Sequence, residues 1–161
     1  MTVSADEFKK ALQFWASGIA VVTTFSEKLG AQGMTVTAFS SVSVEPPQIL
    51  VCINENADTG EGIDASQCFA VNVLSSAQQA LSNQFAGGLS QAERFANNPW
   101  ETAVTGAPIL SDTLMSLDCK VVEKVKAGTH WIIIGSVQAC ISREGDPVLY
   151  YRSGYRQLLT E

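Results

Sequence analysis

The chain has 161 residues, of which 46% are hydrophobic and 16% are charged, and its formal net charge at pH 7 is −6. This length suits a single domain over residues 1–161, with enough chain to bury a core. The acidic balance excludes recognition through phosphate neutralisation, so we expect no nucleic-acid partner. No apolar run reaches the roughly 20 residues of a membrane span. The first ten residues also lack the basic segment followed by an apolar segment that is typical of a signal peptide. We therefore expect no membrane association.

The low charged fraction, against about 25% in a typical domain, indicates that surface is buried in an oligomer. The cysteines bear on the compartment. None forms C-x-x-C, and three of the four lie inside apolar runs: Cys52, Cys68, Cys119 and Cys140. This pattern predicts reduced, buried thiols in a cytoplasmic protein.

The first third of the chain predicts one helix and three strands. Ser4 and Glu7 form a capping box, and apolar residues follow at helical spacing until Ser17 and Gly18, where we expect the helix to end. A β-branched strand over residues 19–25 comes next, then a turn over residues 28–33. A hydroxyl-rich strand runs to a turn at residues 45–47, and an apolar strand covers residues 49–53.

The rest of the chain returns to strands after a helical middle. Residues 56–66 are polar and could hold a helical turn, and residues 68–74 read as a strand. Ser75 or Ser76 can cap a helix through Phe85, and a capping box at Ser90 opens a shorter helix. Three strands joined by turns follow, over residues 114–124, 131–141 and 148–151. The predicted fold is mainly β (α+β), an antiparallel sheet curled into a barrel with peripheral helices.

The segment of residues 33–54 is the most informative for function. Threonines and serines alternate with apolar residues, so one face of the segment can join the core while the other presents hydroxyls. Such a face suits a flat ligand with a polar edge and a phosphate. No Lys or Arg lies between Leu29 and Glu93, so hydroxyls and backbone N–H groups would have to hold that phosphate.

Other motifs leave their alternatives open. Residues 60–65 spell G-x-G-x-x-A, but acidic residues stand where a pyrophosphate would approach and no repeated βαβ pattern surrounds it, so we reject a dinucleotide fingerprint. His130 is the only histidine, and no Cys, Asp or Glu stands near it at the spacing of a metal site, so we expect no bound metal. It is either an ordinary turn residue or a functional residue. Residues 150–156 are either a strand with a solvated tail or an aromatic, cationic flap.

Taken in order, several segments resemble short-chain flavin reductases, the reductase components of two-component flavin-dependent monooxygenases such as the 4-hydroxyphenylacetate hydroxylase system. These segments read GMTVTAFSSVSVEPPQILVCIN, FAVNVL, NQFAG followed by ERF, AGTH, and PVLYYRSGYRQL. The resemblance runs from the first helix to Leu158. It implies an FMN-binding split β-barrel with Greek-key-like strands, a homodimer, and NADH- or NADPH-dependent reduction of FMN or FAD for a partner monooxygenase.

The resemblance also implies site residues. Those that would line the isoalloxazine and ribityl chain are Met34, Thr35, Val36, Thr37, Ala38, Ser40 and Ser41. Cys52, Ile53 and Asn54 would contact the flavin from the next strand, and Thr59 would lie near the phosphate. The other edge would be closed by Phe85, Ala86 and Gly87. His130, the candidate catalytic residue, and Tyr155 would face the nicotinamide.

The chain departs from the family pattern at two positions. Asp58 stands where many members carry a basic residue, and Thr129 stands where many carry an aspartate. Two other functions stay open beside flavin reduction: a non-catalytic FMN-binding or redox-sensing protein, and an enzyme similar to pyridoxamine-phosphate oxidase. The latter class usually places several cations on its phosphates, which the hydroxyl-rich segment lacks.

Overall fold

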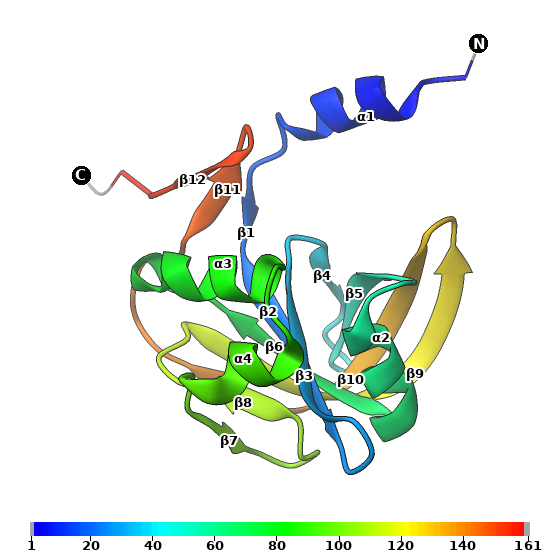
Figure 1. The fold of residues 1–161 in the computed structure, drawn as a ribbon, viewed down its shortest axis with the longest axis vertical. Coiled ribbons are helices and arrows are strands. Elements are labelled where there is room, and N and C mark those ends of the chain that lie inside the picture. The colour runs from blue at the N-terminus through cyan, green and yellow to red at the C-terminus, as the bar shows by residue number, and fades with distance from the viewer. Residues whose placement is uncertain (1, 160–161) are drawn as a thin grey trace.

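The computed structural model describes residues 2–159, so residues 1, 160 and 161 of the predicted domain lie outside the described residues. Its centre is a seven-stranded antiparallel sheet with the order β3-β2-β6-β9-β10-β5-β4 (Figure 1). The strands of this sheet are β2 (Ala20–Ser26), β3 (Gly30–Val36), β4 (Phe39–Ser43), β5 (Gln48–Asn54), β6 (Cys68–Val73), β9 (Met115–Ala127) and β10 (His130–Ser142).

The two edges of this sheet are joined by the chain itself. β3 and β4 lie at opposite ends of the strand order, yet only Thr37 and Ala38 separate them in sequence. The sheet must therefore curl until its edges approach. The Cys52 N–H donates to the Ala38 carbonyl at 3.1 Å, which extends the pairing of β4 with β5 up to this crossing. The result is a barrel that is split beside β3, as the mainly β prediction requires.

Small sheets and helices surround the barrel. The hairpins are β7 (Trp100–Thr102) with β8 (Pro108–Leu110), and β11 (Leu149–Tyr151) with β12 (Gly154–Arg156), the second of which also pairs with β1 (Ser17–Gly18). The helices are α1 (Ala5–Leu12), α2 (Asp58–Ser66), the 3-10 turn η1 (Ser76–Gln78), α3 (Gln79–Ala86) and α4 (Gln91–Ala96). Helix α1 projects away from the barrel beside the β11–β12 hairpin (Figure 1).

Strand β2 is buried on both faces because different layers cover them. Ala20 and Val22 point into the barrel core with Phe69 and Ile133. Val21 points outward to a second core under α3, which it shares with Phe85. A strand covered on both faces reads as a continuous apolar run, which is what residues 19–22 show.

Most predicted elements are confirmed, and three boundaries are wrong. The hydroxyl-rich strand is two strands, because the chain leaves β3 at Val36 and crosses to the far edge of the sheet as β4. The first helix ends at Leu12, and Ser17 and Gly18 instead pair with β11. The turn predicted over residues 28–33 is shorter, because β3 already begins at Gly30. The predicted capping boxes at Ser4 and Ser90 are present, and of the two candidate caps Ser75 and Ser76 it is Ser75 that caps η1.

All four cysteines are free thiols. Cys68 and Cys119 are buried as expected, and burial, ahead of the nearby Asp118 and Cys140, raises the pKa of the Cys119 thiol to about 12. The prediction of burial is wrong for Cys140, which is exposed, and holds only partly for Cys52. Cys140 lies near the end of β10, beyond the β-bulge between Val137 and Ala139, where the strand leaves the closely packed part of the barrel.

Candidate functional site

The end of β3 borders a cavity of about 420 Å³, which we call the hydroxyl cavity. Val36 turns its side chain into the barrel core, so its neighbours Thr35 and Thr37 face outward, toward α3 and the C-terminal hairpin. No charged side chain lines this cavity. Its walls come from β3, α3 and the β11–β12 hairpin: Ile19, Thr35, Val36, Thr37, Ser82, Asn83, Ala86, Tyr150, Ser153 and Tyr155.

Hydrogen bonds from both sides of the hydroxyl cavity meet at Ser82. The Thr35 hydroxyl donates to the Ser82 carbonyl at 2.7 Å. The Tyr155 hydroxyl lies 3.0 Å from Ser82 Oγ and 2.6 Å from Asn83 Oδ1. Because a phenol carries one proton, Tyr155 donates to the closer Asn83 oxygen and accepts from Ser82. These bonds hold the C-terminal hairpin against α3.

The turn of the C-terminal hairpin is strained. Arg152 and Ser153 have φ angles of 49° and 58°, a left-handed conformation that costs a non-glycine residue about 1–2 kcal/mol. The Arg152 N–H donates to the Gln13 carbonyl at 2.9 Å, which ties the turn to the segment after α1. The flap interpretation of residues 150–156 fits this arrangement better than a solvated tail does.

A second cluster of predicted residues lies where β5 meets α2. The Ala57 N–H donates to the Asn54 carbonyl at 3.1 Å, and the Asn54 side chain accepts from the Asn56 N–H at 2.9 Å. Among the described residues no side chain caps α2, so N–H groups of its first turn are free to bind an anion. The Thr59 hydroxyl in that turn is buried and has no hydrogen-bond partner. Both features fit the phosphate of a flavin.

His130 lies beside this cluster. It is exposed, opens β10, and stands opposite Asn54 in the register of β5. Its Nδ1 is 3.0 Å from the Thr129 hydroxyl, and the Thr129 carbonyl accepts the Glu55 N–H at 3.0 Å. The histidine is therefore held at the rim of the β5–α2 corner, and it does not line the hydroxyl cavity.

The surface beyond α2 is strongly charged. A cavity of about 300 Å³ there is lined by four carboxylates and Lys124. Lys124 and Lys126 lie 4.2 and 4.9 Å from the centre of the Trp131 ring. Lys124 pairs with Asp64 at 2.6 Å, and Lys126 pairs with Glu55. Asp58 is exposed on this acidic side of α2.

The predicted site residues thus separate into three groups. Around the hydroxyl cavity and its continuation lie Thr35, Thr37, Ala38, Ala86 and Tyr155. The β5–α2 corner contains Cys52, Asn54, Thr59 and His130.

The third group holds the remaining predicted residues, some in or beside the core and some exposed. Val36, Ile53 and Phe85 have buried side chains, and Met34 packs against the core, so the first three can offer a ligand only their backbone. Gly87 follows α3 in an exposed, positive-φ conformation. Ser40 and Ser41 are exposed on β4, opposite Leu50 and Ile49 of β5 and away from the β5–α2 corner.

Sequence reasoning missed Ser82, Asn83 and Ser153 in the hydroxyl cavity. Nothing in their local pattern distinguishes them from ordinary helix and turn residues. Arg94, the cation nearest to β3 in this layer, donates to the Gly33 and Leu89 carbonyls at 2.8 and 3.2 Å. It therefore fastens α4 to β3.

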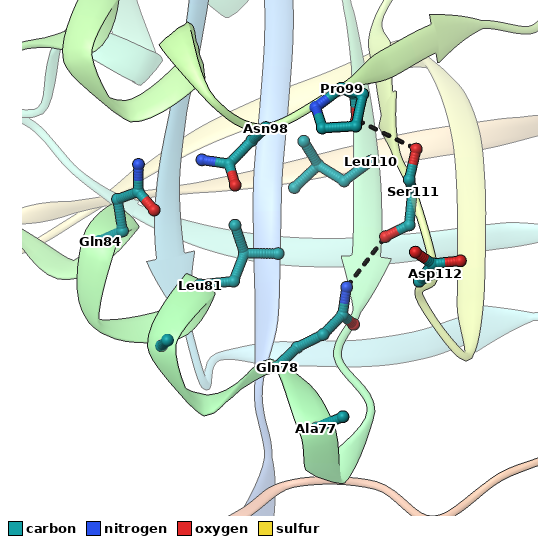
Figure 2. A pocket seen from close by; sticks show the side chains of 10 residues that line it. Ala77, Gln78, Leu81, Gln84, Asn98, Pro99, Leu110, Ser111 and Asp112 are labelled. Atoms are coloured by element: carbon teal, nitrogen blue, oxygen red, sulfur yellow. Dashed lines mark hydrogen bonds between the residues drawn. The ribbon is translucent and has the colours of Figure 1, made fainter.

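A further cavity of about 300 Å³ lies on the other side of α3 (Figure 2). Its polar groups bond to one another: Gln78 donates to the Ser111 carbonyl at 2.9 Å, and Ser111 donates to the Pro99 carbonyl at 3.2 Å. No predicted site residue lines it. Within residues 2–159 no cluster of three or more His, Cys, Asp or Glu side chains could hold a metal, and no helix there is long and apolar enough to cross a bilayer.

Comparison with known proteins agrees with this geometry. The model of the flavin reductase like domain matches residues 12–159. A Pseudomonas syringae protein named FMN reductase (NADH) RutF is 39% identical over 160 residues, which cover 99% of this chain and 89% of that protein.

Solved structures agree as well. That of the flavin reductase PheA2 superposes with a TM-score of 0.89 at 37% identity, covering 98% of this chain and all of that one. The flavin reductase of styrene monooxygenase from Pseudomonas putida S12 gives a TM-score of 0.85 at 26% identity, covering 96% and 98%. The family match spans nearly the whole described chain, and the resemblance found in the sequence motifs is confirmed: this chain belongs to the family of flavin reductase like domains.

Proposed function

We propose that this protein is an NAD(P)H-dependent flavin reductase that reduces FMN or FAD by hydride transfer. The observation that carries the proposal is the hydroxyl cavity, which combines two threonine hydroxyls, tyrosines and backbone but has no charged side chain. Hydride transfer between two cofactor rings needs stacking and exclusion of water more than acid–base groups. The curated relatives named FMN reductase (NADH) support flavin and NADH as the reacting pair.

Each group of residues has a part in this scheme. The flavin would supply the hydride acceptor, and its ring would lie along Thr35, Thr37 and Ala38. The free N–H groups of α2 and the Thr59 hydroxyl would hold the phosphate. Tyr155, fixed by Ser82 and Asn83, would limit water access from the hairpin side, and His130 would contact the carboxamide of the nicotinamide.

The reduced flavin would serve a partner monooxygenase. Support comes from solved relatives described as reductase components of a styrene monooxygenase and of a two-component tryptophan halogenase. We further propose a cytoplasmic protein, because all four cysteines are free thiols.

The protein would act as a homodimer. Helix α1 has eight residues and no buried side chain, and Val3 and Phe8 are 71% and 58% exposed. An isolated helix of this length is marginal in water, so it needs a surface to pack on. A second copy of the chain supplies that surface symmetrically.

A steady-state assay tests the activity. NADH and NADPH are each combined with FMN, FAD and no flavin, and nucleotide oxidation is followed by absorbance. Flavin-dependent turnover above the enzyme-free rate supports the proposal, and the relative rates show whether NADH or NADPH and whether FMN or FAD is preferred. Tight FMN binding without turnover would instead identify a non-catalytic flavin-binding protein.

A further inference from the structure

Helix α3 separates the hydroxyl cavity from the cavity shown in Figure 2, which we call the amide cavity. Ser82 and Asn83 line the first, whereas Leu81 and Gln84 line the second together with residues 110–112. The amide cavity has a volume of about 300 Å³, at the lower end of the range for ligand pockets, so it suits a small molecule. The proposed flavin chemistry gives it no part.

Two side-chain amides of the amide cavity have fixed orientations. The Gln84 nitrogen donates to the Glu93 and Arg94 carbonyls at 3.3 and 3.2 Å. The Asn98 nitrogen donates to the same Arg94 carbonyl. Because a carbonyl can only accept, each amide must turn its nitrogen toward these partners and its oxygen away from them. Within residues 2–159 neither oxygen receives a hydrogen bond, and both are directed toward the Leu81 side chain (Figure 2).

The remaining walls of the amide cavity add one carboxylate and apolar surface. Asp112 is its only charged lining residue. One Asp112 oxygen accepts from Arg143 at 2.9 Å, and the other has no partner in the described part of the chain. Both members of this pair are exposed, so the pair is weak and can rearrange around a ligand. Leu81, Pro99 and Leu110 supply apolar surface. The cavity thus combines unused acceptors with an apolar floor.

We propose that the amide cavity binds a small organic cation, in which an amidinium, guanidinium or primary ammonium group is attached to an apolar body. The N–H groups of the cation donate to the Gln84 and Asn98 oxygens, and Asp112 supplies the countercharge. The apolar body covers the leucines of the floor. An anion would instead meet amide oxygens and a carboxylate, in a chain whose net charge is −6. No flavin or nucleotide takes part, so the inference stands apart from the proposed function.

The test uses three probes of the same shape and different charge. Benzamidine is a cation with N–H donors, benzamide is neutral, and benzoate is an anion that can only accept hydrogen bonds. Binding of each to the full chain is measured by titration calorimetry or by ligand-observed NMR, with no flavin or nucleotide present. We expect a Kd on the order of 1 mM for benzamidine, because so few atoms make contact. Benzoate should bind at least about tenfold more weakly, with benzamide between the two.

Two substitutions assign the binding to the amide cavity. Gln84→Met keeps the length of the side chain but removes its acceptor, and Ala80→Leu fills the cavity from α3. The matched controls are Gln79→Met and Gln79→Leu, at an exposed position of the same helix outside the cavity. We expect each cavity variant to weaken benzamidine binding about five- to tenfold, and the controls to leave it unchanged.

Thermal melts of all four variants confirm that they fold, which matters because Gln84 also ties α3 to α4. Ala80→Leu keeps that tie, so the test does not depend on Gln84→Met alone. An absence of benzamidine binding, or equal affinity for benzoate, would overturn the inference. Unchanged benzamidine affinity in both cavity variants would also overturn it and would place the cation elsewhere, such as in the acidic cavity beside α2.

Discussion

Ser82 connects the two walls of the hydroxyl cavity, since Thr35 reaches its carbonyl and Tyr155 reaches its hydroxyl. Sequence motifs predicted both partners, but they gave no signal for the serine that joins them. Helical position alone decides that Ser82 and Asn83 face β3 and the hairpin. Sequence motifs therefore identify site residues that belong to a recognisable strand motif. They miss residues such as Ser82, which only tertiary packing brings to the cavity.

The role of His130 can be tested by substitution. We expect His130→Ala to slow reduction of bound flavin by NADH while the affinity for oxidised flavin stays nearly unchanged, because the imidazole stands at the exposed rim opposite Asn54. Rapid-mixing reduction rates and flavin titration measure the two effects, with Gln138→Ala as an exposed control on the same strand. An equal loss of flavin affinity would move His130 into the flavin pocket.

Asp58 offers a test of the phosphate position. It is the first residue of α2 and is exposed beside the free N–H groups. Removing its repulsion toward a phosphate should let Asp58→Lys bind FMN about two- to fivefold more tightly at low salt, with less gain as salt rises. Riboflavin lacks the phosphate and should not gain.

The control for this substitution is Glu101→Lys, the same charge change at an exposed position of β7. An equal response of FMN and riboflavin, or none, would place the phosphate away from the start of α2. Thermal melts of each variant are needed as well, because an acidic residue at a helix start also stabilises the helix.

The hydroxyl-rich segment illustrates what sequence can specify about elements. Period-2 alternation correctly predicted that Val36 faces the core, but it is wrong for Val42 and Val44 of the same segment, which are 46% and 91% exposed. It could not reveal the crossing at Thr37 and Ala38, because one long strand and two strands at opposite edges have the same local pattern. Barrel closure is a long-range event, which no local pattern specifies.

Close packing inside β10 predicts a specific sensitivity. A methyl group added at Gly135 would lie 2.6 Å from Phe69 Cζ and 2.9 Å from Cys119 Cβ in the barrel core. We expect Gly135→Ala to lower the free energy of unfolding by about 1–3 kcal/mol, because neither neighbour can move without disturbing the core. Gly18→Ala is the matched control, since nothing lies within 4 Å there. Equal denaturation midpoints for the two variants would contradict this packing.

For the whole molecule, the mainly β class, the antiparallel arrangement and the family were predictable from turn-linked strands and motif order. The separation of the predicted site residues between the hydroxyl cavity, the β5–α2 corner and the core was not, because it depends on how the barrel splits and where the C-terminal hairpin lies. The low charged fraction also predicted an oligomer, and the projecting helix α1 is the candidate for its interface.

Sedimentation tests the homodimer. We expect the wild-type protein to sediment as a dimer at micromolar concentration and Phe8→Glu to shift it toward monomer, because a charge would enter the apolar face of α1. Lys10→Gln, exposed on the same helix, should leave the dimer intact. A monomeric wild-type protein would refute the assembly, and an unchanged Phe8→Glu dimer would place its interface elsewhere.

The most direct test of the account is a single-turnover experiment without oxygen. The protein is mixed with one equivalent of FMN and then with NADH, and flavin absorbance near 450 nm is followed against an enzyme-free control. The account predicts that the absorbance disappears with one equivalent of NADH, much faster than in the control. Flavin that binds but keeps its absorbance, or that bleaches only at the enzyme-free rate, would contradict flavin reduction as the function of this protein.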